Sequence, residues 1–376
     1  MADVVIAFDP GASLAKVVYR VKGTKECKLL TMPPEVAMGL QRESIESHLS
    51  SRLGLGTFSA EQEAWVSCQG KCVAVGELAR EFLATYQMDS LKYESALYSI
   101  LAVVGAIAFR HRLSKFSVSL AVLLPYGQYR TRERLEELLK ASLKNFEFRG
   151  TKLRVRLDEF ICQPEGGGLV TARMKERGKE WFRTSQVAVC MFGHRNTSLL
   201  LFKQGRLAKG ETTQLGFHQL ISKVIERTSG QEIDLLTRVI CEMGENISVD
   251  ASGLDQLIKS TIASNAQVEK QELVSAISLA RNEYWQRLEG WLRKVLPLDV
   301  GEVILCGGAA LYLRFELKRY FHGRSVYWGT ELQNRVQQTL GLDYRSDEPN
   351  KESLSFRLCD LYALFEHLES RVEILT

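Results

Sequence analysis

The sequence predicts an α/β protein made of two similar halves. Near residue 4, three strands follow one another and are separated by two glycine turns, and the same order returns near residue 186. A further apolar strand starts near Gly301 and runs into Gly307-Gly308, which opens a helix. Because strands that alternate with helical segments are typical of α/β folds, we expect two α/β domains.

The composition fits a folded protein of two or three domains. The chain has 376 residues, of which 45% are hydrophobic and 25% charged. The net charge of +4 is mild and the cations are spread along the chain, which argues against a dedicated nucleic-acid binder. The longest apolar run, 101–109, is too short to span a membrane, and Asp3 and Asp9 interrupt the first apolar run. We therefore expect no membrane association, no signal peptide and a cytoplasmic location.

The eight cysteines predict free thiols. Cys68 and Cys72 are the only close pair, and no second pair is present to complete a zinc site. Four others lie in apolar runs and are expected to be buried: Cys162, Cys190, Cys306 and Cys359. We expect reduced cysteines and no metal at the close pair.

The N-terminal domain is predicted over residues 1–180. The uninterrupted apolar run 4–8 predicts a strand buried on both faces, and Asp9 ends it. Gly11 forms the following turn, since glycine adopts backbone angles that other residues avoid. Residues of about 21–85 predict a small subdomain: a third strand at 22–30, an irregular stretch at 31–63, and a hairpin at 64–75 that leads into a helix.

The rest of this domain alternates helices and strands. Asp89-Ser90 predicts the cap of a long helix through Arg110, with one buried apolar face. A buried strand follows at 117–124, then an amphipathic helix at 131–145 and one or two strands at 153–162. Three glycines, 166–168, precede a predicted helix start.

The C-terminal domain is predicted over residues 181–376. It begins with a strand at 186–192, a turn at 193–196 and a return strand at 197–202. A helical subdomain is expected over about 211–297, with helices at 216–228, 233–243, 253–263 and 271–296. After the Gly307-Gly308 turn, a short strand at 326–328 and helices at 332–341 and 353–374 complete the chain.

Three glycine turns stand at strand ends: Gly11, Gly193 and Gly307-Gly308. Such turns direct successive backbone N–H groups into a concavity, which can hold phosphate. A Gly-Gly turn at a helix start lacks side chains, so a base or ribose can approach it closely. Each turn alone also occurs in ordinary hairpins and tight strand-to-helix connections. Together they indicate a nucleotide site.

With these motifs the chain resembles the actin-like ATPases, most closely the bacterial plasmid-segregation actins of the ParM/StbA group. Residues 9–16 look like that family's first phosphate loop. Other segments resemble its small-subdomain signature (75–79), the strand end before its first connecting segment (123–126), the region of its water-activating glutamate (163–166), its adenosine loop (304–310) and its closing helix (357–362). The resemblance implies the duplicated, ribonuclease H-like actin fold, with two domains around a nucleotide cleft.

The resemblance also implies roles for single residues. Asp9 would hold Mg²⁺ through water, and Glu165 would orient the attacking water; these two are the expected catalytic residues. The remaining expected contacts are to ATP. They are Gly11, Ala12, Ser13 and Lys16 on the phosphates; Gly193, His194, Arg195, Asn196 and Thr197 in the second phosphate loop; Gly307, Gly308 and Ala309 at the adenosine; and Lys223 and Glu226 at the purine or ribose edge. The choice between ATP and GTP stays open.

One position departs from the family pattern. Where the second phosphate loop normally begins with Asp, this chain has Met191, and no carboxylate lies between Glu180 and Glu211. A single preorganised group of this kind is commonly worth ~10²–10³ in rate. His194 or Arg195 could supply positive charge toward the γ-phosphate, or both could point to solvent. We therefore expect ATP binding with slow hydrolysis.

The sequence is compatible with three functions. The first is a nucleotide-dependent, head-to-tail filament that segregates plasmid DNA through an adaptor protein, without strong DNA binding of its own. The second is a non-hydrolysing actin-like scaffold or binding module, which Met191 favours. The third is a small-molecule kinase; it ranks last because no loop offers a carboxylate base apart from Glu165.

Overall fold

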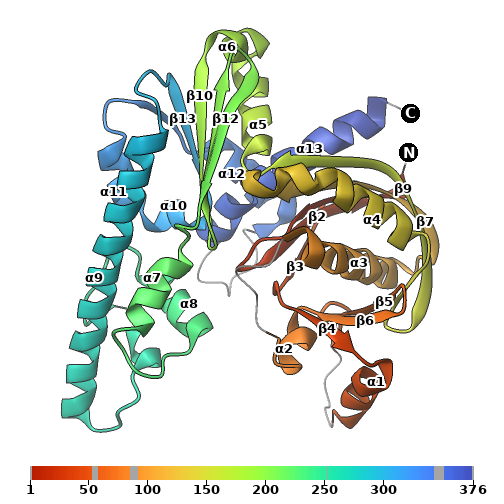
Figure 1. Ribbon diagram of the computed structural model, residues 1–376, viewed down its shortest axis with the longest axis horizontal. Coiled ribbons are helices and arrows are strands. Elements are labelled where there is room, and N and C mark those ends of the chain that lie inside the picture. The colour runs from red at the N-terminus through yellow and green to blue at the C-terminus, as the bar shows by residue number, and fades with distance from the viewer. Residues whose placement is uncertain (1, 53–57, 85–91, 252, 343–350, 375–376) are drawn as a thin grey trace. The chain divides into compact units, whose positions relative to one another are not determined.

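The computed structural model describes residues 2–52, 58–84, 92–251, 253–342 and 351–374 (Figure 1). The chain divides into two compact units, residues 1–172 with 358–376, and residues 173–357. The domain limits given above, 1–180 and 181–376, stay predictions. Within the described residues, every helix is too short or too polar to cross a membrane.

The first unit is built on a sheet of nine strands in the order β3-β2-β1-β7-β9-β8-β5-β6-β4. At its centre, β1 pairs antiparallel with β2 and parallel with β7, and β7 pairs parallel with β9. The carboxyl ends of β1, β7 and β9 therefore share one edge of the sheet. The strands are β1 (Val4–Asp9), β2 (Ala15–Val21), β3 (Lys28–Met32), β4 (Val36–Leu40), β5 (Trp65–Cys68), β6 (Lys71–Val75), β7 (Lys115–Leu124), β8 (Phe146–Phe148) and β9 (Thr151–Pro164).

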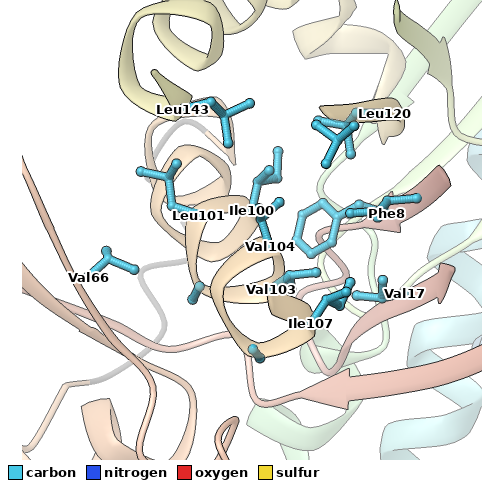
Figure 2. Packing of buried hydrophobic residues seen from close by; sticks show 14 of the residues in the cluster. Phe8, Val17, Val66, Ile100, Leu101, Val103, Val104, Ile107, Leu120 and Leu143 are labelled. Carbon is cyan, nitrogen blue, oxygen red and sulfur yellow. The ribbon is translucent and has the colours of Figure 1, made fainter. Parts of the chain in front are cut away.

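Helix α3 (Lys92–His111) lies in the hydrophobic core of this unit. Its predicted apolar face is buried, and Figure 2 shows Ile100, Val104 and Ile107 beside Phe8 of β1. The other helices of the unit are α1 (Arg42–Ser51), α2 (Glu77–Glu81), the 3₁₀ turn η1 (Tyr126–Thr131), α4 (Arg132–Leu143), the start of α5 (Gly167–Arg177) and most of α13 (Lys351–Ile374). The predicted cap of α3, Asp89-Ser90, lies outside the described residues.

Two sequence predictions in the small subdomain are wrong. The stretch 31–63 is not irregular throughout, because it contains β4 and α1. A bulge breaks the pairing of β4 with β6 between Ala37 and Leu40, so the period-2 pattern that marks a strand is interrupted. The third strand starts at Lys28, six residues later than predicted from Lys22.

The second unit repeats the central pairing of the first around a five-stranded sheet, ordered β12-β11-β10-β13-β14. Here β10 pairs antiparallel with β11 and parallel with β13, as β1 does with β2 and β7. The predicted duplication in architecture is confirmed. The strands are β10 (Gln186–Phe192), β11 (Thr197–Lys203), β12 (Arg206–Thr213), β13 (Glu302–Cys306) and β14 (Ser325–Tyr327).

The long helix α9 (Ala263–Val295) organises the helical part of the second unit. Buried residues at helical spacing, among them Ile277, Tyr284 and Leu288, form its inner face. The predicted helix at 253–263 is wrong: the structure has only a 3₁₀ turn, η2 (Leu254–Leu257), before α9 begins. The other helices are α6 (Lys179–Thr184), α7 (His218–Ile225), α8 (Ile233–Met243), α10 (Gly308–Tyr312), α11 (Arg314–Tyr320) and α12 (Thr330–Leu340).

Candidate nucleotide-binding loops

Asp9 and Lys16 face each other across the first hairpin turn. They are opposite partners in the β1–β2 ladder, and Lys16 Nζ lies 2.6 Å from Asp9 Oδ2. The side chain of Lys16 is only 7% exposed and that of Asp9 14%, so the pair is largely shielded from water. A buried ion pair of this kind holds both side chains in one geometry, because separating them would leave a buried charge without a partner.

The turn between them depends on glycine. A Cβ added at Gly11 would lie 2.4 Å from the carbonyl oxygen of Leu14 and 3.0 Å from Lys16 Nζ. Real Cβ atoms do not approach a backbone oxygen so closely, so any other residue would open the turn. Ala12 is buried and Ser13 exposed in this turn. The tight loop that the sequence predicts after Asp9 is therefore present.

Glu165 lies at the same edge of the sheet as Asp9. It follows directly on β9, and its backbone N–H donates to Leu124 O at the end of β7 over 2.8 Å. Since β1, β7 and β9 are consecutive parallel strands, Asp9 and Glu165 are two strand positions apart, roughly 10 Å. The Glu165 residue is buried. The structure thus places both predicted catalytic carboxylates along one sheet edge of the first unit.

A third carboxylate, which the sequence analysis missed, holds the Glu165 loop in place. Asp360 of α13 accepts hydrogen bonds from the backbone N–H of Gly166 (2.6 Å) and of Leu169 (3.2 Å). The pKa of Asp360 is raised to about 7, chiefly by burial; the two N–H groups lower it, and the charges of Asp9 and Glu165 raise it. A sequence signal existed: Asp360 interrupts the apolar run of the last helix.

In the second unit, the predicted second phosphate loop forms a tight turn after β10. Gly193 N–H donates to Asn196 O over 3.0 Å. His194 O accepts from both the backbone N–H and Nδ1 of His218, each at 3.0 Å. Thr197 is buried and donates its hydroxyl to Leu215 O. The turn is therefore fixed against the start of α7 and has a defined shape.

The two basic side chains of this turn differ in charge. Burial lowers the pKa of His194 to about 4, and the nearby charges of His218 and Arg357 act in the same direction. His194 is therefore neutral at pH 7. Arg195 remains charged, and its Nη1 is buried without a hydrogen-bond partner among the described residues. Any positive charge that this turn offers to a phosphate comes from Arg195.

Met191 and Gly307 meet where β10 and β13 end. Met191 pairs with Cys306, and a Cβ on Gly307 would lie 2.9 Å from Met191 Sδ and 2.2 Å from Phe192 O. Gly307 has φ +92°, which favours glycine. A Cβ added at Gly308 would lie 3.3 Å from Arg357 Cδ. The Gly-Gly turn thus lies against the thioether that replaces the expected Asp.

Lys223 in the last turn of α7 contacts Glu226, the residue that follows this helix. Lys223 Nζ is 2.5 Å from Glu226 Oε2, and both side chains are partly exposed. Such a pair is common on a solvated helix face. Their role at a purine or ribose edge stays a prediction.

Comparison with known proteins agrees with this architecture. Residues 7–168 match the family model of the actin-like proteins' N-terminal domain. A search against curated protein sequences finds no match. The structure is similar to a subunit of a 15-stranded ParM filament from Clostridium botulinum, with 13% identity, a TM-score of 0.60, and coverage of 98% of this chain and 100% of that one.

Two further solved structures show the same likeness. ParM from Bacillus thuringiensis in apo form has 16% identity and a TM-score of 0.53, with 98% of both chains covered. The archaeal actin homologue Ta0583 in complex with ADP has 13% identity and a TM-score of 0.58, with 98% of this chain and 99% of that chain covered. These likenesses establish the fold.

Proposed function

We propose that this chain, which carries an actin-like protein N-terminal domain and has the fold of the bacterial actin homologues, is a nucleotide-binding protein that assembles into filaments. The likeness over the whole chain to the subunit of a ParM filament carries the proposal. Identical subunits joined head to tail generate a filament when their rotation does not close a ring. Its proposed task is plasmid DNA segregation in the cytoplasm through an adaptor protein.

The proposed ligand is ATP, which the first unit would hold by its phosphates. The turn of Gly11, Ala12 and Ser13 supplies backbone N–H groups, and Lys16 supplies positive charge. The ADP complex of Ta0583 supports nucleotide binding on this fold. The second unit would add Arg195 at the phosphates and Gly307-Gly308 at the adenosine.

Asp9 is the proposed contact for Mg²⁺, through water. Magnesium keeps several waters and is usually held by one or two carboxylates together with substrate phosphates, so a single carboxylate at the phosphate loop fits it. Bound Mg²⁺ would neutralise phosphate charge. Asp9 would orient the coordinated water, while Lys16 keeps Asp9 in position by the 2.6 Å contact.

Glu165 is the proposed residue that orients the attacking water. Its position at the carboxyl end of β9 is fixed by two hydrogen bonds. Its own N–H donates to Leu124 O, and the N–H of the next residue, Gly166, donates to the Asp360 carboxylate. The second loop adds no carboxylate, because Met191 stands where the family has Asp. We therefore propose that hydrolysis is slow.

The second candidate function is a nucleotide-stabilised scaffold that does not hydrolyse ATP. Two observations favour it: Met191 contributes no carboxylate, and His194 is neutral at pH 7. Nucleotide binding does not depend on either group. Without a carboxylate at position 191 and a positive charge at His194, however, the loop has fewer groups that could assist phosphoryl transfer.

Sedimentation tests the filament. The protein is expected to pellet with ATP and to stay in the supernatant without nucleotide, and GTP is run in parallel to test base choice. Asp9→Ala is expected to weaken the nucleotide response; an unchanged response removes Asp9 from the site. A protein that never pellets over a wide concentration range contradicts the filament. Phosphate release then separates the two candidates, since the scaffold releases none.

A further inference from the structure

A cavity lies in the second unit, at the opposite edge of its sheet from the predicted adenosine loop. The cavity has a volume of about 610 Å³. Its lining comes from the end of α9, from the segment that leads into β13, and from the end of α11 with the residue before β14: Trp285, Glu289, Arg293, Leu296, Leu298, Arg319, Tyr320 and Arg324. Gly307 follows the carboxyl end of β13, whereas Leu298 and Arg324 precede the starts of β13 and β14. The cavity is therefore separate from the nucleotide loops.

Two lining side chains carry buried hydrogen-bond donors without a partner. Trp285 is only 7% exposed, and its Nε1 has no acceptor among the described residues. The Nη1 of Arg324 is likewise buried and without a partner there. Buried donors are almost always satisfied in folded proteins, because leaving one unpaired costs its hydration. Two such donors line one cavity, where an external acceptor could satisfy both.

The charges around the cavity favour an anion as the acceptor. Three arginines line it, against the single carboxylate of Glu289. That carboxylate is already paired, with Arg293 Nη2 at 2.6 Å. Arg324 makes no ion pair with a described residue. A carboxylate or phosphate would accept charge-assisted bonds from Arg324 and a further bond from the indole N–H of Trp285.

The walls of the cavity favour a protein ligand over a bare anion. Trp285 and Tyr320 meet edge to face with ring centroids 6.1 Å apart. Leu298, 91% exposed, stands at the rim. Tryptophan, tyrosine and arginine are the residues enriched in the energetic centres of protein interfaces, and aliphatic side chains add apolar contact area.

We propose that this cavity binds an acidic segment of a partner protein. A glutamate or aspartate side chain of that segment accepts hydrogen bonds from Trp285 Nε1 and Arg324 Nη1, and a neighbouring apolar side chain packs on Leu298 and Tyr320. The proposal is independent of the nucleotide site and of filament formation. It holds for a monomer in the absence of nucleotide.

Nuclear magnetic resonance of the tryptophan side chains tests it in the full chain. The protein, ¹⁵N-labelled at its five indole groups, is titrated without nucleotide with a capped peptide of glutamate, leucine and glutamate. Trp285→Phe keeps the aromatic wall and identifies the Trp285 indole signal by its loss. The peptide is expected to shift this signal in the wild-type protein.

Two variants and two alternative probes make the result decisive. Arg324→Gln is expected to weaken peptide binding by about tenfold or more, since it removes a charge-assisted donor. Lys144→Gln, which removes one exposed charge in the first unit, is the matched control and leaves binding unchanged. Thermal melting checks that both variants are folded. The glutamine version of the peptide should not bind.

Several results overturn the proposal. They are an unshifted Trp285 signal, equal binding of the glutamine peptide, full binding by Arg324→Gln, and a signal that shifts with inorganic phosphate but not with the peptide. The last of these would assign the cavity to a small phosphate-bearing ligand.

Discussion

Asp360 shows how a single buried carboxyl can connect two distant segments. It lies 194 residues from Gly166 in the sequence, yet it fixes the backbone of the loop that carries Glu165. Its pKa is raised, chiefly by burial and also by the charges of Asp9 and Glu165, so the protonation of Asp360 depends on both predicted catalytic carboxylates. Protonation of Asp360 at about neutral pH would loosen its hold on the loop, because a carboxylic acid accepts fewer hydrogen bonds than a carboxylate.

A pH series with Asp360→Asn tests this coupling. The pKa of Asp360 is about 7 in the folded chain and 3.8 as the ordinary value, so the folded state binds the proton more tightly than the unfolded state. The contribution of Asp360 to the free energy of unfolding is therefore greatest below pH 3.8. It falls as the pH rises from 3.8 to about 7, the pKa of Asp360 in the folded chain. The wild-type free energy of unfolding should fall by about 4 kcal/mol relative to that of Asp360→Asn between pH 4 and pH 7.5. Urea unfolding at each pH measures it.

Asp158→Asn is the matched control for this series. Arg156 lowers the pKa of Asp158 by a hydrogen bond, so the sign is reversed: the contribution of Asp158 is present at neutral pH and is lost on acidification. If the wild type and Asp360→Asn show parallel pH profiles, Asp360 has an ordinary pKa and the coupling is absent.

At the scale of elements, the connection from β13 to α10 has a strict backbone requirement. Gly307 combines φ +92° with ψ 152°, a region that only glycine adopts readily. An added Cβ would also lie 2.2 Å from Phe192 O, so the strand end of β10 would have to move. This close approach explains why strand and helix follow each other here without a loop.

Gly307→Ala is therefore expected to destabilise the chain by about 3 kcal/mol or more, from backbone strain and overlap together. Gly301→Ala is the control, since its Cβ would lie 3.4 Å from Gln186 O, in ordinary contact, and should cost about 0.5 kcal/mol. Thermal unfolding compares the two. Equal stabilities would show that the turn tolerates a side chain.

The elements that the sequence predicts well are those with uninterrupted apolar runs. The strands β1, β7, β10 and β13 are buried along nearly their whole length, so their patterns are plain. Strand β4 was missed because a bulge and exposed residues break its pattern, and α1 because only Ile45 of it is buried. The start of α9 was placed too late, since its first turns are polar and exposed.

The candidate site likewise contains residues that a local sequence pattern indicates and residues that it does not. The glycine turns and Asp9 follow from local pattern, since each stands at a strand end, whereas Glu165 is indicated by the resemblance to the actin-like ATPases. Asp360 was not predicted as a site residue because its role rests on contacts across the chain, which a local pattern does not contain. The unpaired donors of Trp285 and Arg324 likewise became visible only in three dimensions.

For the whole molecule, the proposed slow hydrolysis would determine how long the proposed filament lasts. In a nucleotide-dependent polymer, hydrolysis converts subunits to a state with a different affinity for their neighbours, and only that difference in affinity can drive disassembly. If Met191 keeps hydrolysis slow, filaments formed with ATP should disassemble on dilution at nearly the same rate as those formed with a non-hydrolysable analogue.

Met191→Asp tests this link between one side chain and the assembly. Supplying the carboxylate that this loop lacks is expected to raise phosphate release by about tenfold or more, because a single preorganised group has an effect of this order or greater. Filaments of the variant should then disassemble faster in ATP but not in the analogue, as followed by light scattering after dilution. Met191→Leu keeps the apolar shape beside Gly307 and should behave like the wild type.

Unchanged phosphate release in a folded Met191→Asp protein would mean that the absent carboxylate does not limit turnover. Faster release with unchanged disassembly would mean that hydrolysis does not control the filament.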